Sequence, residues 1–447
     1  MKYKIPVRSK KFHASRYKNG RKCHNRNYKK ATEEKQFSPS AMKAQMEEVF
    51  KKAGFREKRK ADERPRILII RDDAAGDFIL FSSFLREVRN IYKEAHITLV
   101  TSPRNHNLAQ CCPYVDNIEI NTKEYNKNDT LLGLQIAAER AIHYLPYNFD
   151  IAFVPRLGAR YYGFVTAFLA GATEVVGFTN DRINPFTGEV QKALWDVFST
   201  VTVPFEIANI SDADRNLQLL EYLIKLPFSE KARRLELWYT SDDRKKAEEI
   251  LAPLRRDEIK GLMALVPGAS TPSKRWPAEN YKKLIAEILK IDPYLGFVVL
   301  GGPGDKEVAE DIAEAIGDHA VSAAGKCSFR ESAALMEKLG GYIGNDTGLL
   351  HIAAAAKLPI LQVNCFPANL PMTPVSIPAR FAPYKVPSVT VFPEKALDGC
   401  NEPLAYGCSH VADAHCITAV KVETVLQGYG ILKRRIEAND LTPLYLK

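Results

Sequence analysis

The sequence predicts an α/β protein made of two doubly wound halves, each a parallel sheet covered by helices. Short apolar runs suited to buried strands alternate with segments whose apolar residues recur every three or four positions, as in amphipathic helices. Strands that alternate with helices are typical of a parallel sheet. The alternation starts again near residue 262, which indicates a second unit of the same class.

The first half begins after Pro65 with RILII, a run suited to a buried strand. A polar turn at 71–77 follows, and then a helix whose apolar residues between Leu80 and Ile91 lie on one face. A second helix is expected around YYGFVTAFLAGA. Further strands are expected at HITLVT (96–101), DNIEI (116–120), FDIAFVP (149–155) and EVVGF.

The second half repeats this order. Pro277 stands in the first turn of a predicted helix, WPAENYKKLIAEILK, and Gly317 ends another, DKEVAEDIAEAIG. The expected strands are LMALVPG (262–268), GFVVLGG (296–302), GGYIGN (340–345) and PILQVN (359–364). The predicted organisation is a basic extension at 1–63, an N-terminal domain at 64–232, a C-terminal domain at 233–415, and a terminal segment at 416–447 whose helix packs back on the N-terminal domain.

Basic residues are concentrated at the N-terminus. The net charge of the chain is +10, yet residues 1–66 hold 22 Lys and Arg against 7 Asp and Glu, so the remainder is mildly acidic. The first 63 residues are too polar to bury a core, and we expect a flexible or partly helical arm. Such an arm is either a solvated tail or attracted to an anionic surface, nucleic acid or acidic lipid.

Other classes of protein are disfavoured by composition. The start MKYKIPVRSKK has no apolar run after its charges, and no stretch of about twenty apolar residues occurs, so neither a secretory signal nor a membrane span is expected. We therefore expect a cytoplasmic protein. The spacing of Cys400, Cys408 and Cys416, with His410 and His415 among them, is wider than in most zinc sites, and packed thiols with no metal are the prediction.

Three loops at the ends of predicted strands carry the candidate site, because open α/β sheets bind ligands there. The first, RDDAAGD, offers Asp77 at the start of a helix, where the helix dipole favours an ionised carboxylate able to accept a proton. Taken alone, this loop is better explained by an aspartate in the first turn of a helix without any chemistry. The pyrophosphate fingerprint G-x-G-x-x-G is absent.

The second loop, PGASTPSKRWP, has small and hydroxyl residues followed by Lys274 and Arg275 before a helix. That composition is typical of phosphate binding, although an exposed basic loop fits as well and no Walker A motif is present.

The third loop is GNDTGLLH, whose Asp-Thr-Gly is also the triplet of aspartic proteases. Such proteases need two carboxylates that share a proton, whereas this sequence has one triplet and a helical segment after it. We expect Asp346 or Thr347 to cap the helix and Gly348 to let a ligand approach the backbone, so that the free N–H groups favour an anion. His351, four residues after Thr347, lies on the same helix face. A helix cap without a ligand is the alternative.

In their order and spacing, these segments resemble glycosyltransferase family 9, the heptosyltransferases of lipopolysaccharide assembly. The resemblance rests on RILIIRDDAAGDFIL, HITLV, YVDNI, VPGASTPSKRWPAENYKKLI, VVLGGPGD and GNDTGLLHIAAAAKLPIL, and it covers about residues 66–430. It implies the GT-B fold, with two Rossmann-like domains facing across a cleft. It also implies an inverting enzyme, without a tightly held metal or other cofactor, that transfers heptose from ADP-heptose to a lipopolysaccharide core or related glycolipid.

The resemblance also implies roles for individual residues. Asp77 would be the general base, with Arg71, Asp73 and Gly76 beside it on the acceptor side. The donor would be held by residues of the C-terminal domain: Ser270, Lys274, Arg275, Asp305, Asp346, Thr347, Gly348, Leu349 and His351. Asp305 is the candidate for the ribose. No metal ligand is expected.

Two departures from the family pattern leave alternatives open. Ser82 and Ser83 stand where the family commonly has proline, and NCFPANLPMTP replaces a Gly-x-Thr loop, so the donor could be another nucleotide sugar used for O-chain or capsule synthesis. The alternative from another class is a nucleic-acid-binding protein that acts through its arm, although nucleic acid is not the partner we expect. The arm could instead hold the enzyme on the cytoplasmic face of the inner membrane.

Overall fold

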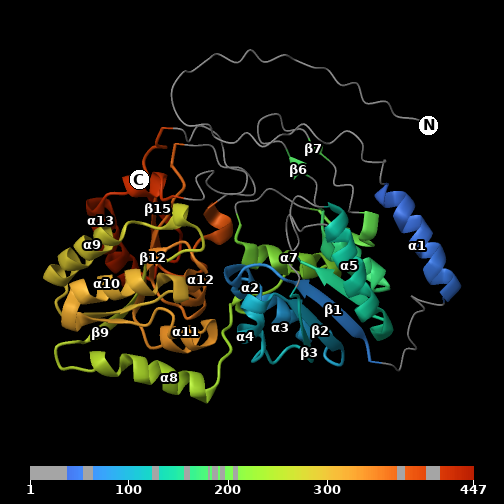
Figure 1. Cartoon of the computed structure of the whole chain (residues 1–447), viewed down its shortest axis with the longest axis horizontal. Helices are drawn as coiled ribbons and strands as arrows, with labels where there is room; N and C mark the ends of the chain where they lie inside the picture. Colours follow the sequence, from blue (N-terminus) through green and yellow to red (C-terminus); the bar gives the residue numbers. More distant parts are fainter. Residues whose placement is uncertain are drawn as a thin grey trace, which may run out of the picture.

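The computed structural model describes residues 38–53, 64–122, 130–155, 162–179, 182–183, 190–191, 197–204, 210–369, 378–398 and 413–447. Two parallel sheets, one from each half of the chain, form two units that lie side by side (Figure 1). The predicted α/β class with two doubly wound halves is confirmed. Most of the predicted basic extension lies outside the described residues. Its helix α1 (Pro39–Ala53) packs Met42 and Met46 against the core of the first unit.

The first sheet has the order β3-β2-β1-β4-β5-β8, and all its neighbours are parallel. Its strands are β1 (Arg66–Arg71), β2 (His96–Thr101), β3 (Asn117–Ile120), β4 (Ile151–Val154), β5 (Glu174–Phe178) and β8 (Val201–Val203). The covering helices are α2 (Ala75–Ile79), α3 (Ser82–Ile91), α4 (Pro103–Ala109), α5 (Thr130–Tyr144), α6 (Tyr162–Leu169) and α7 (Asp212–Ile224), and a short antiparallel pair, β6 (Arg182–Ile183) and β7 (Val190–Gln191), lies beside them.

The first predicted helix is interrupted. Helix α2 ends at Ile79 and α3 starts at Ser82, because the Ser82 hydroxyl donates to the carbonyl of Ile79 at 2.7 Å and Phe84 bonds back to Phe81 in a tighter turn. Both pieces keep the predicted apolar face, and Phe84 is fully buried.

The second sheet has the order β11-β10-β9-β12-β13-β14-β15, again with parallel neighbours. Its strands are β9 (Gly261–Val266), β10 (Leu295–Val299), β11 (Ala320–Ser322), β12 (Gly341–Asn345), β13 (Ile360–Val363), β14 (Ser388–Val391) and β15 (Leu444–Leu446). Its helices are α8 (Ser241–Leu251), α9 (Ala278–Ile291), α10 (Lys306–Ile316), α11 (Phe329–Met336), α12 (Gly348–Ala355) and α13 (Val422–Glu437).

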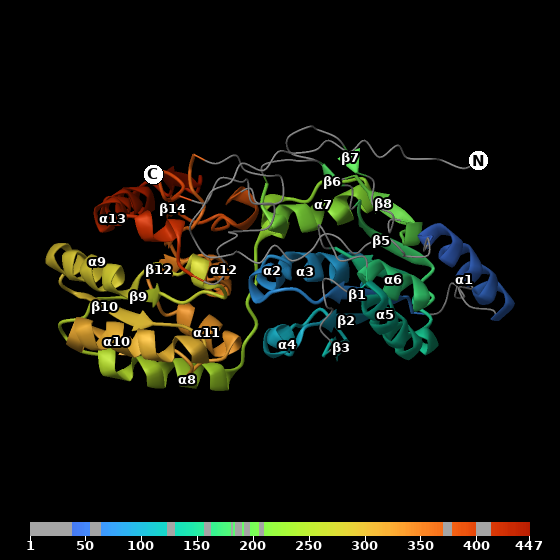
Figure 2. The ribbon, with the colours of Figure 1, turned by 45° about the horizontal axis from the view of Figure 1, so that its top comes forward.

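The predicted packing of the terminal helix was wrong. Helix α13 packs on the second unit, where Val425, Tyr429 and Leu432 join the core formed by β13, β14 and α9 (Figure 2). The reason is the last strand, β15, which pairs with β14 and holds the chain end on the second sheet. Tyr429 adds a hydrogen bond of 2.8 Å to Asp292 at the end of α9. The second unit therefore extends beyond residue 415.

The segment between α7 and α8 is fastened to the first unit. Glu236 accepts hydrogen bonds from Arg86 at 2.6 Å and from the Tyr114 hydroxyl at 2.7 Å, and its N–H donates to the Ser82 hydroxyl at 2.9 Å. Thr240 then caps α8 in a capping box with Asp243. The chain therefore passes from one unit to the other within a few residues of Thr240.

Candidate functional site

The site lies where the strand order of each sheet reverses, between β1 and β4 and between β9 and β12. Ligands of open α/β sheets bind in the crevice beyond the strand ends at such points. The loops after β1, β9 and β12 are those that the sequence singled out, and helices α2 and α12, which follow two of them, contact each other across the two units (Figure 1).

A glycine at position 76 permits this contact. A Cβ atom on Gly76 would lie 2.5 Å from Cδ2 of His351, and one on Gly348 would lie 3.4 Å from both the Cβ of Ala75 and the backbone nitrogen of Gly76. Real Cβ atoms do not approach other atoms to 2.5 Å, so the glycine at position 76 is required for this approach. The start of α12 thereby reaches the loop that carries Asp77.

Lys274 and Asp346 form an ion pair in the second unit. Nζ of Lys274 lies 2.5 Å from Oδ2 of Asp346, and the two side chains are 30% and 12% exposed. The Asp346 carboxylate raises the pKa of Lys274, although burial opposes this. Burial acts to raise the pKa of Asp346, but the Lys274 ammonium outweighs it, so this pKa lies below its ordinary value. Both groups are charged at neutral pH, and the partly exposed ammonium is available to an anion.

His351 is buried between the two loops, with 4% of its surface exposed. Burial lowers its pKa below the ordinary 6.5, in spite of the negative charges of Asp346 and Asp77, so the ring is neutral at pH 7. Within the described part of the chain, its Nδ1 atom has no hydrogen-bond partner. The charge of Asp77 acts on both His351 and Lys274: it partly opposes the lowering of the His351 pKa and adds to the rise in the Lys274 pKa, so the three predicted site residues interact electrostatically.

Helix α12 starts as the sequence predicted, with Thr347 at its N-cap. The Thr347 side chain makes no capping hydrogen bond, and Asp346 points to Lys274 instead. The first N–H groups of a helix, here those of Gly348 and Leu349, have no partner within the helix and favour an anion. The Lys274 ammonium, paired with Asp346 directly before the N-cap, and the N-terminus of α12 are therefore both placed to bind an anion here.

Asn345 is a site residue that sequence reasoning missed. Its side chain is fully buried, its Oδ1 accepts from the Tyr281 hydroxyl at 2.8 Å and from the Trp276 N–H at 3.2 Å, and its Nδ2 donates to the Pro267 carbonyl at 2.6 Å. These bonds tie the loop that carries Lys274 to the turn that carries Asp346. A polar residue at the end of an otherwise apolar strand was the available signal.

Arg71 and Asp73 lie beneath the loop rather than on its surface. They are 2% and 8% exposed, and Nε of Arg71 donates to Asp73 at 3.1 Å. The other guanidinium nitrogens donate to the carbonyls of Pro155 at 2.9 Å and Asp77 at 3.2 Å. Both residues were predicted on the acceptor side; in the structure Asp73 pairs with Arg71, and Arg71 holds the backbone of Asp77.

The remaining predicted donor residues shape the loop after β9. Arg275 donates twice to the carbonyl of Ala269, at 3.0 and 2.8 Å, and lies 3.5 Å from Asp305. Asp305 accepts from the N–H of Gly302 at 2.9 Å, so this carboxylate is engaged in its own turn. Ser270 is exposed at the loop tip.

The described residues contain no group of three or more His, Cys, Asp and Glu side chains arranged to hold a metal ion. Of the cysteines and histidines considered above as zinc ligands, Cys400, Cys408 and His410 lie outside the described residues. Among the described helices, none combines the length and apolar character needed to cross a bilayer.

Comparison with solved structures defines the class of fold. The glycosyl transferase family 9 protein from Veillonella parvula superposes with a TM-score of 0.64 at 19% identity, covering 84% of this chain and 99% of that one. The ADP-heptose lps heptosyltransferase II of E. coli superposes with a TM-score of 0.57 at 16% identity, covering 83% and 99%. The two facing α/β units are therefore the fold of these transferases.

Sequence comparison finds a family match over part of the chain. Residues 186–364 match the model of glycosyltransferase family 9 (heptosyltransferase), so the resemblance predicted from the sequence is confirmed over that region. Lipooligosaccharide heptosyltransferase 2 of Haemophilus influenzae is 35% identical over 107 residues, 23% of this chain and 30% of that protein. The sequence match thus spans less than a third of the length of this curated relative.

Proposed function

We propose that this protein is an inverting glycosyltransferase that transfers a sugar from a nucleotide sugar, most directly heptose from ADP-heptose, to a lipopolysaccharide core or related glycolipid. The observation that carries this proposal is the Lys274–Asp346 pair at the start of α12, together with Asp77 of the other unit, whose charge acts on Lys274. The names of the relatives support the choice of donor and acceptor: lipooligosaccharide heptosyltransferase 2 and ADP-heptose lps heptosyltransferase II.

The donor would lie on the second unit. Its diphosphate gains negative charge as the glycosidic bond breaks, and Lys274 together with the N–H groups of Gly348 and Leu349 would stabilise that charge. Asp346 would orient Lys274 and contact the sugar. A fixed ammonium in this place supports a reaction without a tightly bound metal ion.

The acceptor would lie on the first unit. A sugar hydroxyl is a weak nucleophile, so a base must take its proton as the new bond forms. Asp77 is the proposed base: its charge acts on Lys274 and His351, and Arg71 donates to its backbone carbonyl at 3.2 Å. Attack from this side, with the nucleotide leaving toward Lys274, inverts the anomeric centre.

A panel of nucleotide sugars tests the donor. We expect ADP-heptose and ADP to raise the melting temperature of the protein, because a ligand that binds only the folded state stabilises it. UDP- and GDP-sugars are the controls and should leave the melting temperature unchanged. If only one of these other nucleotide sugars raised it, the donor would instead be one used for O-chain or capsule synthesis.

The place of action is proposed to be the cytoplasmic face of the inner membrane, with the basic arm attracted to anionic lipid. Flotation with anionic liposomes, for the full chain and for a chain without residues 1–37, tests this. Equal flotation of both chains contradicts it, and salt-sensitive RNA binding lost with the same deletion would support the nucleic-acid alternative.

A further inference from the structure

A second polar contact joins the two units on the side of α7. Arg380, in the short 3-10 helix Pro378–Phe381 that precedes β14, donates from Nε and Nη2 to both carboxylate oxygens of Asp212 at 2.8 and 2.7 Å. Both residues are 5% exposed. A bidentate pair fixes the angle as well as the distance between its partners, and burial shields it from salt. The first residue of α7 is thereby held to the second unit.

The same helix holds the loop of the proposed base. Asn216, one turn after Asp212, accepts from Arg71 at 3.3 Å and donates to the carbonyl of Leu80 at 3.3 Å. Arg71 in turn donates to the carbonyl of Asp77 at 3.2 Å. Helix α7 thus contacts Arg380 of the second unit at its first residue and supports the Asp77 loop one turn later. A rigid helix with both contacts couples the orientation of the second unit to the position of that loop.

Asp212 also lies close to the site itself, since its charge is among those that act to raise the pKa of His351. Arg215 approaches the same carboxylate, with Nε 3.4 Å from Oδ1, so Asp212 keeps a cation beside it when Arg380 is replaced. Replacing Arg380 is therefore the milder way to break the contact, because no buried carboxylate is left without a partner.

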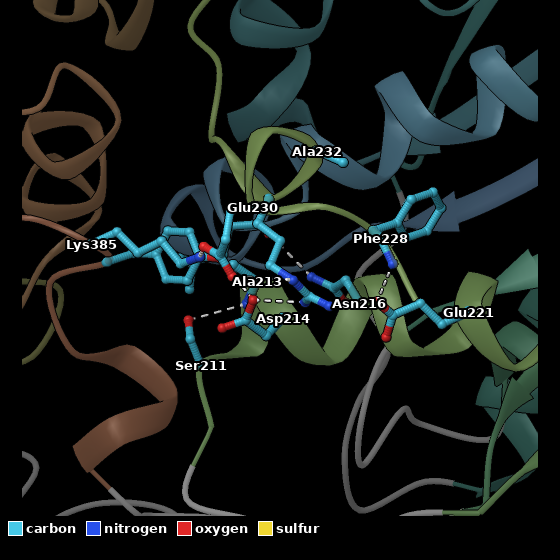
Figure 3. Close-up of polar contacts among 12 residues, drawn as sticks. Ser211, Ala213, Asp214, Asn216, Glu221, Phe228, Glu230, Ala232 and Lys385 are labelled. Atoms are coloured by element: carbon cyan, nitrogen blue, oxygen red, sulfur yellow. Dashed lines mark hydrogen bonds and ion pairs between the residues drawn. The ribbon is translucent and has the colours of Figure 1, made fainter. Parts of the chain in front are cut away.

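The surrounding contacts supply a control. Tyr384 donates to Asp214 at 2.8 Å, and Arg233 pairs with Asp214 and Glu221. Lys385, the residue after Tyr384, pairs with Glu230 (Figure 3), but the Glu230 side chain is 81% exposed. Exposed ion pairs contribute little to stability. The Lys385–Glu230 pair is therefore a control for the buried Arg380–Asp212 pair: it is the same type of contact, but it is exposed.

We infer that Arg380 and Asp212 are positioning residues, which set the orientation of the two units so that Asp77 faces Lys274 and Asp346. This inference rests on the proposed function. A general base must lie within hydrogen-bond reach of the proton it takes, and a misplacement of about 1 Å can cost about 100-fold in rate. The donor groups all belong to the second unit, so donor binding is not expected to depend on this contact.

The test compares Arg380→Gln with Lys385→Gln in the full chain. We expect Arg380→Gln to lower kcat at least tenfold while the affinity for ADP, measured by calorimetry, changes less than twofold. Hydrogen exchange should become faster in peptides covering 71–80 and 346–352. Lys385→Gln should match the wild type in all three. Should Arg380→Gln fail to fold, Arg380→Lys, which keeps the charge but loses the bidentate geometry, replaces it in the same comparison.

Unchanged kcat and exchange in the Arg380 variant would overturn the inference. So would a loss of ADP affinity that parallels the loss of kcat, since Arg380 would then support the second unit alone. If the wild-type protein neither binds ADP nor transfers a sugar, the proposed function has failed. Exchange in 71–80 and 346–352 still shows whether Arg380 holds the two loops together, and the positioning role falls if it does not.

Discussion

His351 of the second unit covers Gly76 of the first so closely that a Cβ atom at position 76 would lie 2.5 Å from its Cδ2 atom. This contact joins the two helices whose starts carry Asp77 and Gly348. The proposed base and the proposed donor groups therefore occupy one site only when the two units approach each other as they do in this structure.

Gly76→Ala tests that approach. The added methyl group would collide with the His351 ring, so we expect a loss of turnover of about tenfold or more with each unit still folded. Gly430→Ala in α13 is the control, because its Cβ would meet nothing within 4 Å, and the change should raise stability by up to about 1 kcal/mol without affecting turnover. The loss caused by Gly76→Ala should be smaller in a His351→Ala background than in the wild type, so the double variant is compared with His351→Ala alone. An equal fold-loss in both backgrounds would exclude this collision as the cause.

Asp77→Asn is expected to lower turnover by at least about 100-fold, because the amide cannot accept the proton of the attacking hydroxyl. The affinity for ADP should stay the same, as measured by calorimetry. Asp72→Asn, in the same loop, is the matched control and should lower turnover less than tenfold. Equal effects of the two changes would remove the base assignment from Asp77.

Lys274→Ala is expected to weaken ADP binding by about 10- to 100-fold, the usual contribution of a hydrogen bond to a charged group. Part of the loss comes from Asp346, which would remain close to the phosphates without its cation. The double variant Lys274→Ala/Asp346→Asn should therefore bind ADP more tightly than Lys274→Ala alone. Lys283→Ala, an exposed lysine of α9, should bind like the wild type. An unchanged affinity in Lys274→Ala would place the phosphates elsewhere.

The buried, neutral His351 predicts a dependence of stability on pH. Its pKa is lower in the folded chain than the ordinary 6.5, so the unfolded chain binds the proton first as the pH falls. Stability is then full above about pH 6.5 and is lost as the pH falls toward the folded pKa. Urea unfolding at pH 7.5 and 5.5 should show a smaller difference for His351→Gln than for the wild type. The same difference in both proteins would show that His351 does not contribute.

Much of the fold follows from local pattern. Apolar runs such as RILII predicted five of the six described strands of the first sheet and four of the seven of the second, because strands buried on both faces are apolar throughout. Strands β8, β11, β14 and β15 were not predicted. The placement of α13 was wrong because it depends on β15, three residues near the chain end whose pairing with β14 no local pattern shows. The break between α2 and α3 depends on one hydroxyl of Ser82, a residue that also suits a continuous helix.

The loops of the site could be predicted from the sequence, but the buried residues that hold these loops in place could not. Lys274, Asp346 and His351 stand in recognisable strand-to-helix turns, so the sequence indicated them and the structure brings them together. Asn345 and the Arg380–Asp212 pair act through partners 64 to 168 positions away, and no spacing in the sequence indicates such contacts. The burial of Arg71 was missed for the same reason, since its partner Asn216 lies 145 positions on.

Asp77 of the first unit and the Lys274–Asp346 pair of the second are proposed to transfer a sugar with inversion. Incubation of the purified chain with ADP-heptose and a lipopolysaccharide core acceptor, followed by NMR of the product, tests this proposal most directly. We expect a glycoside whose anomeric configuration is opposite to that of the donor, formed with stoichiometric release of ADP and lost in Asp77→Asn. A product with retained configuration, or no transfer from any nucleotide sugar that the protein binds, would contradict it.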